Sequence, residues 1–180
     1  MKNRPKTAPN LTDSPGQLPL RGRRGARLAR MIGLIQRVTH AEVRIDGAVV
    51  AAISRGMLAL VAVRREDTEA AAERLLERLL DYRIFPDTAG RMNLSTREIG
   101  GGLLLVPQFT LAADTRKGTR AGFSGAAEPA LARRLFGHLL ERARASYPHV
   151  SAGVFGADMQ VSLINDGPVT FWLEAGPAQA

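Results

Sequence analysis

The side chains that could carry out acid–base or metal chemistry are sparse in this sequence, and they form no established catalytic motif. The histidines, His40, His138 and His149, are far apart and lack a metal-binding spacing such as His-x-x-x-His, so we expect each to be structural. The chain contains no Cys, which excludes disulfides, zinc–thiolate sites and thiol nucleophiles. A Gly-x-Ser-x-Gly elbow and a phosphate-binding loop are also missing. We therefore expect no metal, no cofactor and a reaction that depends little on side-chain acids and bases.

One short stretch, residues 165–170 (NDGPVT), places a Gly-Pro step and a hydroxyl between two strand-like runs. The simplest interpretation is a hairpin turn, because Gly and Pro are both favoured in turns. Thr170 could act as a nucleophile, but a Thr nucleophile needs a neighbouring base and no motif marks one. A strand Thr in the wall of a pocket is the better interpretation.

Length and composition indicate one globular domain that is preceded by a basic arm. The chain has 180 residues, 45% of them hydrophobic, and a net charge of +8. Residues 1–30 hold eight basic side chains and one acidic one, so the rest of the chain is almost neutral. The high overall charge is therefore weak evidence for nucleic-acid binding by the folded part.

The arm is rich in Pro and Arg and has no apolar periodicity, so we predict that residues 1–30 are a disordered N-terminal arm. Two alternatives are an organellar transit peptide and an upstream extension of a chain whose translation begins at Met31. No apolar run reaches the roughly 18 to 20 residues of a membrane span. We expect a cytoplasmic protein without membrane contact.

Strand and helix signals alternate from Met31 onwards. Asp46-Gly47 predicts a two-residue hairpin, and residues 56–63 (GMLALVAV) predict a buried strand. A helix is predicted from an Asp67 cap to about Tyr82, and a second one begins at Pro129. Residues 103–111 (LLLVPQFTL) are predicted as a strand, and residues 159–174 as two strands. The fold class is α/β: a single domain (31–174) with a mixed, barrel-like sheet and two main helices, followed by a tail (175–180).

Four ordered segments carry a family resemblance: GLIQRV, RIF…MNLS, GGLLLVPQFTLAADTRKGTR and FGADMQVSLINDGPVT. Together they resemble the D-aminoacyl-tRNA deacylase family over residues 31–174. The resemblance implies a homodimer that binds the 3′ end of tRNA and hydrolyses the ester of a D-amino acid. It also implies that the 2′-OH of the RNA assists the reaction.

The resemblance assigns residues 165–170 a role in chiral selection. It implies that Gly167 and Pro168 form a Gly-cis-Pro step that reaches into the other subunit's site, with Arg37 as its support. Backbone carbonyls would then occupy the space of an L side chain, so selection would work by exclusion. Glycine has no Cβ and would pass this filter, which makes glycyl-tRNA an expected second substrate.

The resemblance also assigns the substrate pocket. Gln108 and Phe109 match the family's substrate-binding segment, and Phe155 and Met159 would form an apolar cleft for the terminal adenosine. The alternative for both apolar residues is ordinary core packing. Pro107 departs from the family, which usually has Ser at this place. A related branch of the fold that carries Pro there is associated with relaxed chiral rejection, so the strictness of selection stays open.

Two other functions remain open from the sequence. The first is a non-catalytic RNA-binding module whose basic arm and DTRKGTR segment contact phosphates, although such a run is more often a solvated loop. The second is the editing of a mischarged L-aminoacyl-tRNA, which Pro107 would permit. Turnover of a charged tRNA distinguishes an enzyme from a binder.

Overall fold

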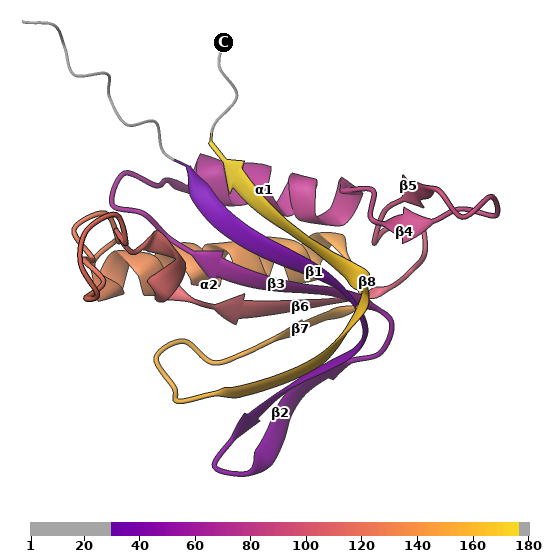
Figure 1. Ribbon diagram of the computed structural model, residues 1–180, viewed down its shortest axis with the longest axis horizontal. Helices are drawn as coiled ribbons and strands as arrows, with labels where there is room; N and C mark the ends of the chain where they lie inside the picture. Colours follow the sequence, from indigo (N-terminus) through magenta and orange to yellow (C-terminus); the bar gives the residue numbers. More distant parts are fainter. Residues whose placement is uncertain (1–29, 177–180) are drawn as a thin grey trace, which may run out of the picture.

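The sheet is built around one long strand, β1 (Met31–Ile45), in a computed structural model that describes residues 30–176 (Figure 1). One edge of β1 pairs in succession with β3 (Gly56–Ala62) and β2 (Ala48–Ile53). The other edge pairs with β8 (Gln160–Ala175) along almost its whole length. All three pairings of β1 are antiparallel.

The rest of the sheet is parallel, in the order β3, β6 (Gly102–Pro107), β7 (Val150–Ala152). The hydroxyl of Ser151 on β7 donates a hydrogen bond to the carbonyl of Ala52 on β2 at 3.1 Å, so the sheet curls back towards its first hairpin. A small separate sheet joins β4 (Phe85–Pro86) to β5 (Met92–Leu94). The fold is the mixed, barrel-like sheet with two main helices that the sequence predicts.

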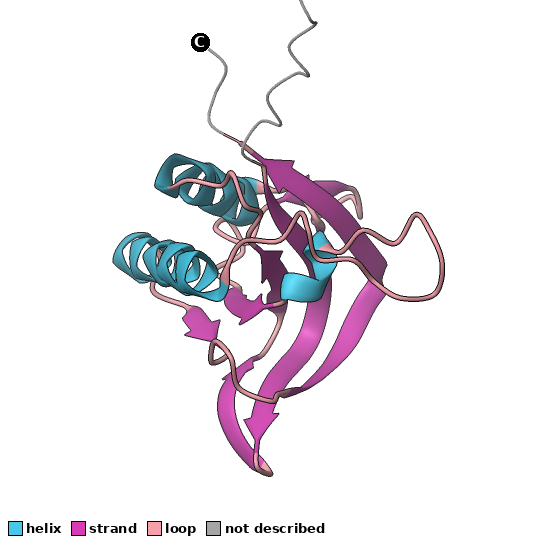
Figure 2. Ribbon diagram, turned by 90° about the vertical axis from the view of Figure 1, so that its left-hand side faces the viewer, coloured by secondary structure: helices cyan, strands magenta, loops and turns pink. Residues whose placement is uncertain are grey.

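Both helices lie on the same side of the sheet (Figure 2). The apolar stripe of α1 (Glu69–Asp81), formed by Leu75, Leu76, Leu79 and Leu80, is buried as predicted. Pro129 occupies the first turn of α2 (Pro129–Ser146), where its missing N–H costs no hydrogen bond. Burying each leucine contributes about 1.5 to 3 kcal/mol, so this layer holds the helices onto the sheet.

The predicted hairpin and one predicted cap have different outcomes. Asp46 and Gly47 have φ values of 49° and 80°, the left-handed pair that a two-residue hairpin turn requires, so this prediction is confirmed. The predicted Asp67 cap is wrong, because Thr68 is the N-cap and accepts from the Ala71 N–H. Asp67 is buried instead, and its Oδ2 accepts from the Arg64 N–H at 2.7 Å.

Two strand predictions need correction. Residues 103–111 do not form one strand, because β6 ends at Pro107 and a short 3-10 helix, η1 (Phe109–Ala112), follows. The Gln108 N–H donates to the Val61 carbonyl at 2.7 Å and closes the ladder at this point. Residues 159–174 do not form two strands either, because β8 is a single strand with two register shifts against β1.

The ends of the chain are described only in part. The predicted arm of residues 1–30 lies outside the described residues except for Arg30. Residues 177–180 of the predicted tail also lie outside them, and β8 runs on to Ala175, the first residue of that tail. Within residues 30–176, no helix is long and apolar enough to cross a membrane.

Candidate active site

A pocket of about 310 Å³ opens where the parallel strands β6 and β7 end. Ligand sites often lie beyond the carboxyl ends of parallel strands, since neighbouring strands separate there. β6 and β7 pair only as far as Leu105 and Ala152, and the chain segments beyond these residues form the walls. The lining residues are Val106, Pro107, Gln108, Phe109, Phe155, Gly156, Ala157, Met159 and Val161. All five residues predicted to bind substrate therefore meet in one pocket.

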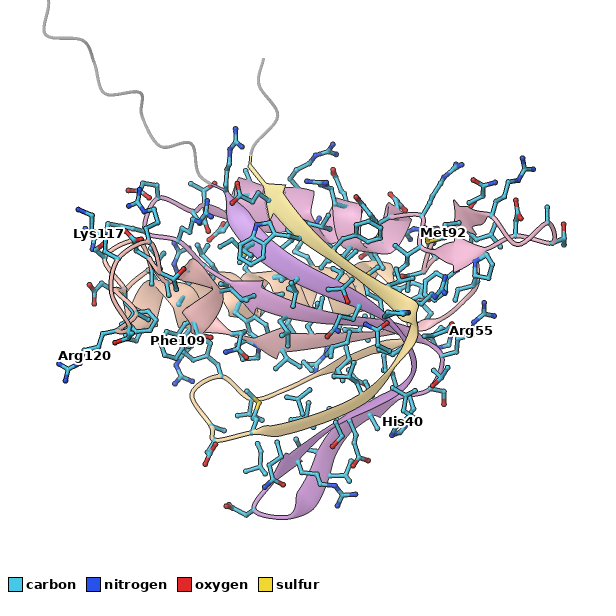
Figure 3. The ribbon with its side chains drawn as sticks, viewed as in Figure 1. His40, Arg55, Met92, Phe109, Lys117 and Arg120 are labelled. Carbon is cyan, nitrogen blue, oxygen red and sulfur yellow. The ribbon has the colours of Figure 1, made fainter. Side chains whose placement is uncertain are left out.

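The start of η1, beside this pocket, has backbone N–H groups without partners in the described part of the chain. A 3-10 helix cannot satisfy its first N–H groups internally, and within residues 30–176 no hydrogen bond engages those of Phe109 and Thr110. The Gln108 side chain donates from Nε2 to the Thr110 hydroxyl at 2.5 Å, which fixes its amide beside the pocket. Phe109 is 58% exposed and lies at the end of the molecule away from β4 and β5 (Figure 3).

Phe155 and Met159 are held in place from outside the pocket. The guanidinium of Arg133 lies 4.9 Å from the centre of the Phe155 ring, and the Phe136 ring packs against it at 6.4 Å. The sulfur of Met159 accepts from the Val154 N–H at 3.3 Å. Both side chains are only partly buried, so they have apolar surface left for a ligand. This role of Arg133 was not predicted from the sequence.

The other predicted residues form a second group at a bulge in β8. On β1, Gln36 pairs with Thr170 of β8 and Val38 pairs with Asn165. Four residues of β8 therefore lie opposite a single residue of β1, Arg37. This bulge, residues 166–169, contains the cis peptide bond between Gly167 and Pro168, and Gly167 has a φ of 141°. A register shift of this kind turns backbone groups out of the ladder.

Arg37 holds the bulge from the neighbouring strand. Its side chain is 12% exposed, and Nε donates to the Asp166 carbonyl at 2.8 Å and lies 3.2 Å from Oδ2 of Asp166. Its Nη1 donates to the carbonyl of Ile84 at 2.7 Å, which connects the bulge to the segment before β4. Arg37 is therefore in contact with Asp166, directly before the Gly-Pro step.

Asn165 closes the bulge from inside, a role that sequence reasoning missed. Its Oδ1 accepts from the Val169 N–H at 2.7 Å, and its Nδ2 donates to the Thr170 hydroxyl at 2.9 Å. The Thr170 hydroxyl also accepts from Nε2 of Gln36 at 3.3 Å. Within the described residues, the hydrogen bonds of this hydroxyl involve amides and no His or carboxylate. An Asn directly before an Asp-Gly-Pro run is a signal that could have indicated these hydrogen bonds of Asn165, which we call the Asn165 clamp.

The two groups lie apart within one chain. Arg37 is opposite Met57, which is opposite Leu103 on β6, and Pro107 follows four residues later. With about 4.8 Å between strands and about 3.3 Å per residue, the bulge lies roughly 20 Å from the pocket. A single subunit therefore does not bring Gly167 and Pro168 to the pocket that Gln108 lines.

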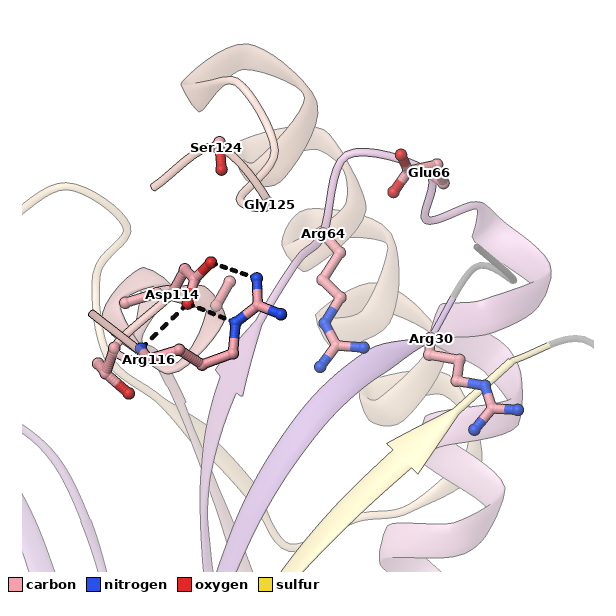
Figure 4. Close-up of a pocket in the computed structure, with 10 residues that line it drawn as sticks. Arg30, Arg64, Glu66, Asp114, Arg116, Ser124 and Gly125 are labelled. Carbon is pink, nitrogen blue, oxygen red and sulfur yellow. Dashed lines mark hydrogen bonds and ion pairs between the residues drawn. The ribbon is translucent and has the colours of Figure 1, made fainter. Parts of the chain in front are cut away.

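A larger pocket, of about 600 Å³, contains none of the predicted site residues (Figure 4). Its arginines are engaged by carboxylates: Arg64 pairs with Glu174 at 2.6 Å and Arg116 with Asp114 at 2.6 Å. Burial would raise the pKa of Glu174, but the hydrogen bond and charge of Arg64 outweigh it and hold the pKa below its usual range. Among residues 30–176, no group of three or more His, Asp or Glu side chains could hold a metal ion.

Comparisons with known proteins agree on one family. Residues 34–174 match the model of the family described as D-Tyr-tRNA(Tyr) deacylase. A D-aminoacyl-tRNA deacylase from Alkalilimnicola ehrlichii is 66% identical over 150 residues, which cover 83% of this chain and all of that protein. Another from Thioalkalivibrio sulfidiphilus is 65% identical, covering 82% of this chain and 99% of that protein.

Solved structures show the same fold. The structure of c-Myc DNA Unwinding Element Binding Protein matches with a TM-score of 0.77 and 36% identity, covering 82% of this chain and 99% of that one. A probable eukaryotic D-amino acid tRNA deacylase matches with a TM-score of 0.69 at 16% identity, covering 81% and 99%. The protein is therefore an enzyme, a hydrolase of carboxylic esters. The chain belongs to the D-aminoacyl-tRNA deacylase family.

Proposed function

We propose that the protein hydrolyses the ester of D-aminoacyl-tRNA and releases a free D-amino acid and tRNA in the cytoplasm. The observation that carries this proposal is the pocket beyond β6, where Gln108, Phe109, Phe155 and Met159 meet in a member of the deacylase family. Phe155 and Met159 are apolar and partly exposed, so they can pack against the terminal adenosine. The N–H groups at the start of η1 can donate hydrogen bonds to the ester carbonyl.

The chemistry follows from positioning more than from side-chain acids and bases. Water attacks the ester carbon, and the N–H groups of Phe109 and Thr110 donate to the oxyanion that develops. The bond from the carbonyl carbon to the 3′ oxygen then breaks, and this oxygen takes a proton. The neighbouring ribose 2′-OH assists the proton transfer. One oxyanion donor of this kind contributes a rate factor of about 10² to 10³.

Chiral selection is assigned to the bulge of a second subunit. In the proposed homodimer, the carbonyls around Gly167 and Pro168 of one subunit enter the pocket of the other and exclude an L side chain. Two observations support a partner on this side of the sheet. No strand of residues 30–176 pairs with the second edge of β8, and Ile164 and Trp172 on this strand are 63% and 48% exposed. Glycyl-tRNA, which has no Cβ, is the expected second substrate.

A specific observation supports a second candidate, the hydrolysis of a mischarged L-aminoacyl-tRNA. Pro107 lies at the pocket and carries no backbone N–H, so one donor that any other residue would offer is missing. Weaker fixation of the ester would relax the discrimination between D and L substrates. The same pocket and the same donors would serve this reaction.

The test is a deacylation assay with purified protein and D-Tyr-tRNA, with electrophoretic tRNA binding measured in parallel. Hydrolysis supports the proposal, whereas a tRNA shift with an intact ester would show a binding module. The shared site is tested by mixing and refolding two variants, Gln108→Ala and Gly167→Ala. Recovery of activity when the two impaired variants are mixed supports a composite site, and a fully active monomer contradicts it.

A further inference from the structure

A basic loop follows η1 and lies beside the substrate pocket. Asp114 and Gly122 exchange backbone hydrogen bonds at 2.6 and 3.0 Å, which closes residues 114–122 into a compact loop. We call this segment the basic loop, because it holds Arg116, Lys117 and Arg120 against one acidic residue. Nothing in the proposed reaction uses these charges.

The cations of this loop differ in how they are engaged. Arg116 forms two hydrogen bonds to the Asp114 carboxylate, at 2.9 and 2.6 Å. Lys117 and Arg120 are exposed, and neither makes a hydrogen bond or ion pair with any described residue. Both project into solvent at the end of the molecule that carries Phe109 (Figure 3). Two positive charges are therefore available to an outside ligand.

An exposed aromatic pair connects this loop to the pocket. Phe123 follows directly after the loop, and its ring centre lies 5.2 Å from that of Phe109, with the planes inclined by 48°. The two residues are 42% and 58% exposed, although aromatic side chains of this size are normally buried. Phe109 lines the substrate pocket, so the pair extends its apolar wall towards Lys117 and Arg120.

We propose that Phe123 and the basic loop bind the unpaired nucleotides that precede the terminal adenosine of the tRNA. This inference rests on the proposed function, because it continues the same RNA strand outward from the pocket. Sites for single-stranded RNA combine aromatic rings, on which bases stack, with cations that follow the phosphates. Phe123 offers a ring to a base, and Lys117 and Arg120 contact the phosphates on either side of it.

The direct test compares two esters of D-tyrosine, one with adenosine and one with the trinucleotide CCA. For the unaltered protein we expect kcat/KM to be at least about fivefold higher for the trinucleotide, because one stacked base contributes that much. In the double variant K117A/R120A this gain falls, mainly through KM, while the adenosine ester is hydrolysed as before. The matched control R74A/R144A removes two exposed charges from the helices and keeps the gain.

Phe123→Leu tests the aromatic part while keeping apolar volume. We expect the trinucleotide gain to fall, with an unchanged unfolding midpoint as evidence of an intact fold. The inference is overturned if both variants keep the full gain. It is also overturned if they lower the rates on the two esters equally, since that would indicate distortion of the pocket through Phe109.

Binding separates this inference from the proposed function. A fluorescent RNA ending in CCA is titrated at several salt concentrations, and the slope of log affinity against log salt is measured. Losing two phosphate contacts in K117A/R120A should reduce the slope by about 1.4. Salt-dependent binding without hydrolysis would refute the proposed function and support the inference, whereas equal slopes would refute the inference.

Discussion

Replacing Arg37 with Ala should weaken both the fold and the proposed chiral selection. The side chain is almost buried and donates charged hydrogen bonds to the carbonyls of Asp166 and Ile84, at 2.8 and 2.7 Å. Each bond of this kind contributes about 1.5 to 3 kcal/mol, and water entering the gap would recover part of the loss. We therefore expect Arg37→Ala to lower the free energy of unfolding by about 3 to 4 kcal/mol.

Arg37→Lys should restore only part of this stability. A single ammonium group cannot reach two carbonyls on different segments in the way a planar guanidinium does, so the loss should be half as large, about 2 kcal/mol. Urea unfolding measures the stabilities. The ratio of D-Tyr-tRNA to L-Tyr-tRNA hydrolysis rates measures selectivity, and we expect it to fall for Arg37→Ala because the bulge loses its brace.

Arg44→Ala is the matched control on the same strand. Arg44 pairs with Glu42 at 2.7 Å but is 42% exposed, so its loss should not move the urea midpoint measurably. The reasoning is refuted if Arg37→Ala behaves like Arg44→Ala, with unchanged stability and an unchanged D-to-L ratio.

Three further predictions concern single positions. In Gly167→Ala the added Cβ would lie 2.6 Å from Cγ2 of Val169, and the backbone φ of residue 167, +141°, is one that alanine rarely adopts. We therefore expect D-selective turnover to fall and the free energy of unfolding, measured by urea titration, to drop by about 1 to 3 kcal/mol. Thr170→Val should keep most of the turnover of D-Tyr-tRNA, because the hydroxyl accepts bonds only from Asn165 and Gln36 within the described residues; complete loss in a folded protein would identify a nucleophile. Burial raises the pKa of Asp67 to about 6, so folding favours its protonated form and the resulting stability is lost as the pH rises through 6. Relative to Asp67→Asn, the unaltered protein should lose up to about 3 kcal/mol between pH 4 and 7, and parallel stability curves would contradict this.

Local signals in the sequence predicted the local structure well. The Asp46-Gly47 turn, the leucine stripe of α1 and the Pro129 helix start each depend on neighbouring residues, and the structure confirms all three. The N-cap was predicted at Asp67, one position before the actual cap Thr68, because Asp and Thr are both favoured as caps. Only the burial of Asp67 in the folded chain distinguishes the two. The strand predicted for residues 103–111 stops at Pro107, because η1 begins at Phe109 and the hydrogen bond from Gln108 to Val61, a long-range contact, is the last of the ladder.

The site required more than local patterns. Family resemblance named the pocket residues, but no periodicity could show that the segment after Pro107 and the segment around Phe155 meet where β6 and β7 separate. The register shift that lifts out residues 166–169 depends on pairing with β1, which lies about 130 positions earlier in the chain. The clamp by Asn165 and the support of Phe155 by Arg133 became visible only with these contacts.

The most direct test of the central claim is the rate of ester hydrolysis on one tRNA(Tyr) charged with D-tyrosine or L-tyrosine, and on glycyl-tRNA, at equal enzyme concentration. Selection by exclusion predicts fast hydrolysis of the D-tyrosyl and glycyl esters and slow hydrolysis of the L-tyrosyl ester, because only the L side chain would meet the carbonyls of the bulge. Equal rates on the D and L esters, or fast hydrolysis of the L ester alone, would contradict the account.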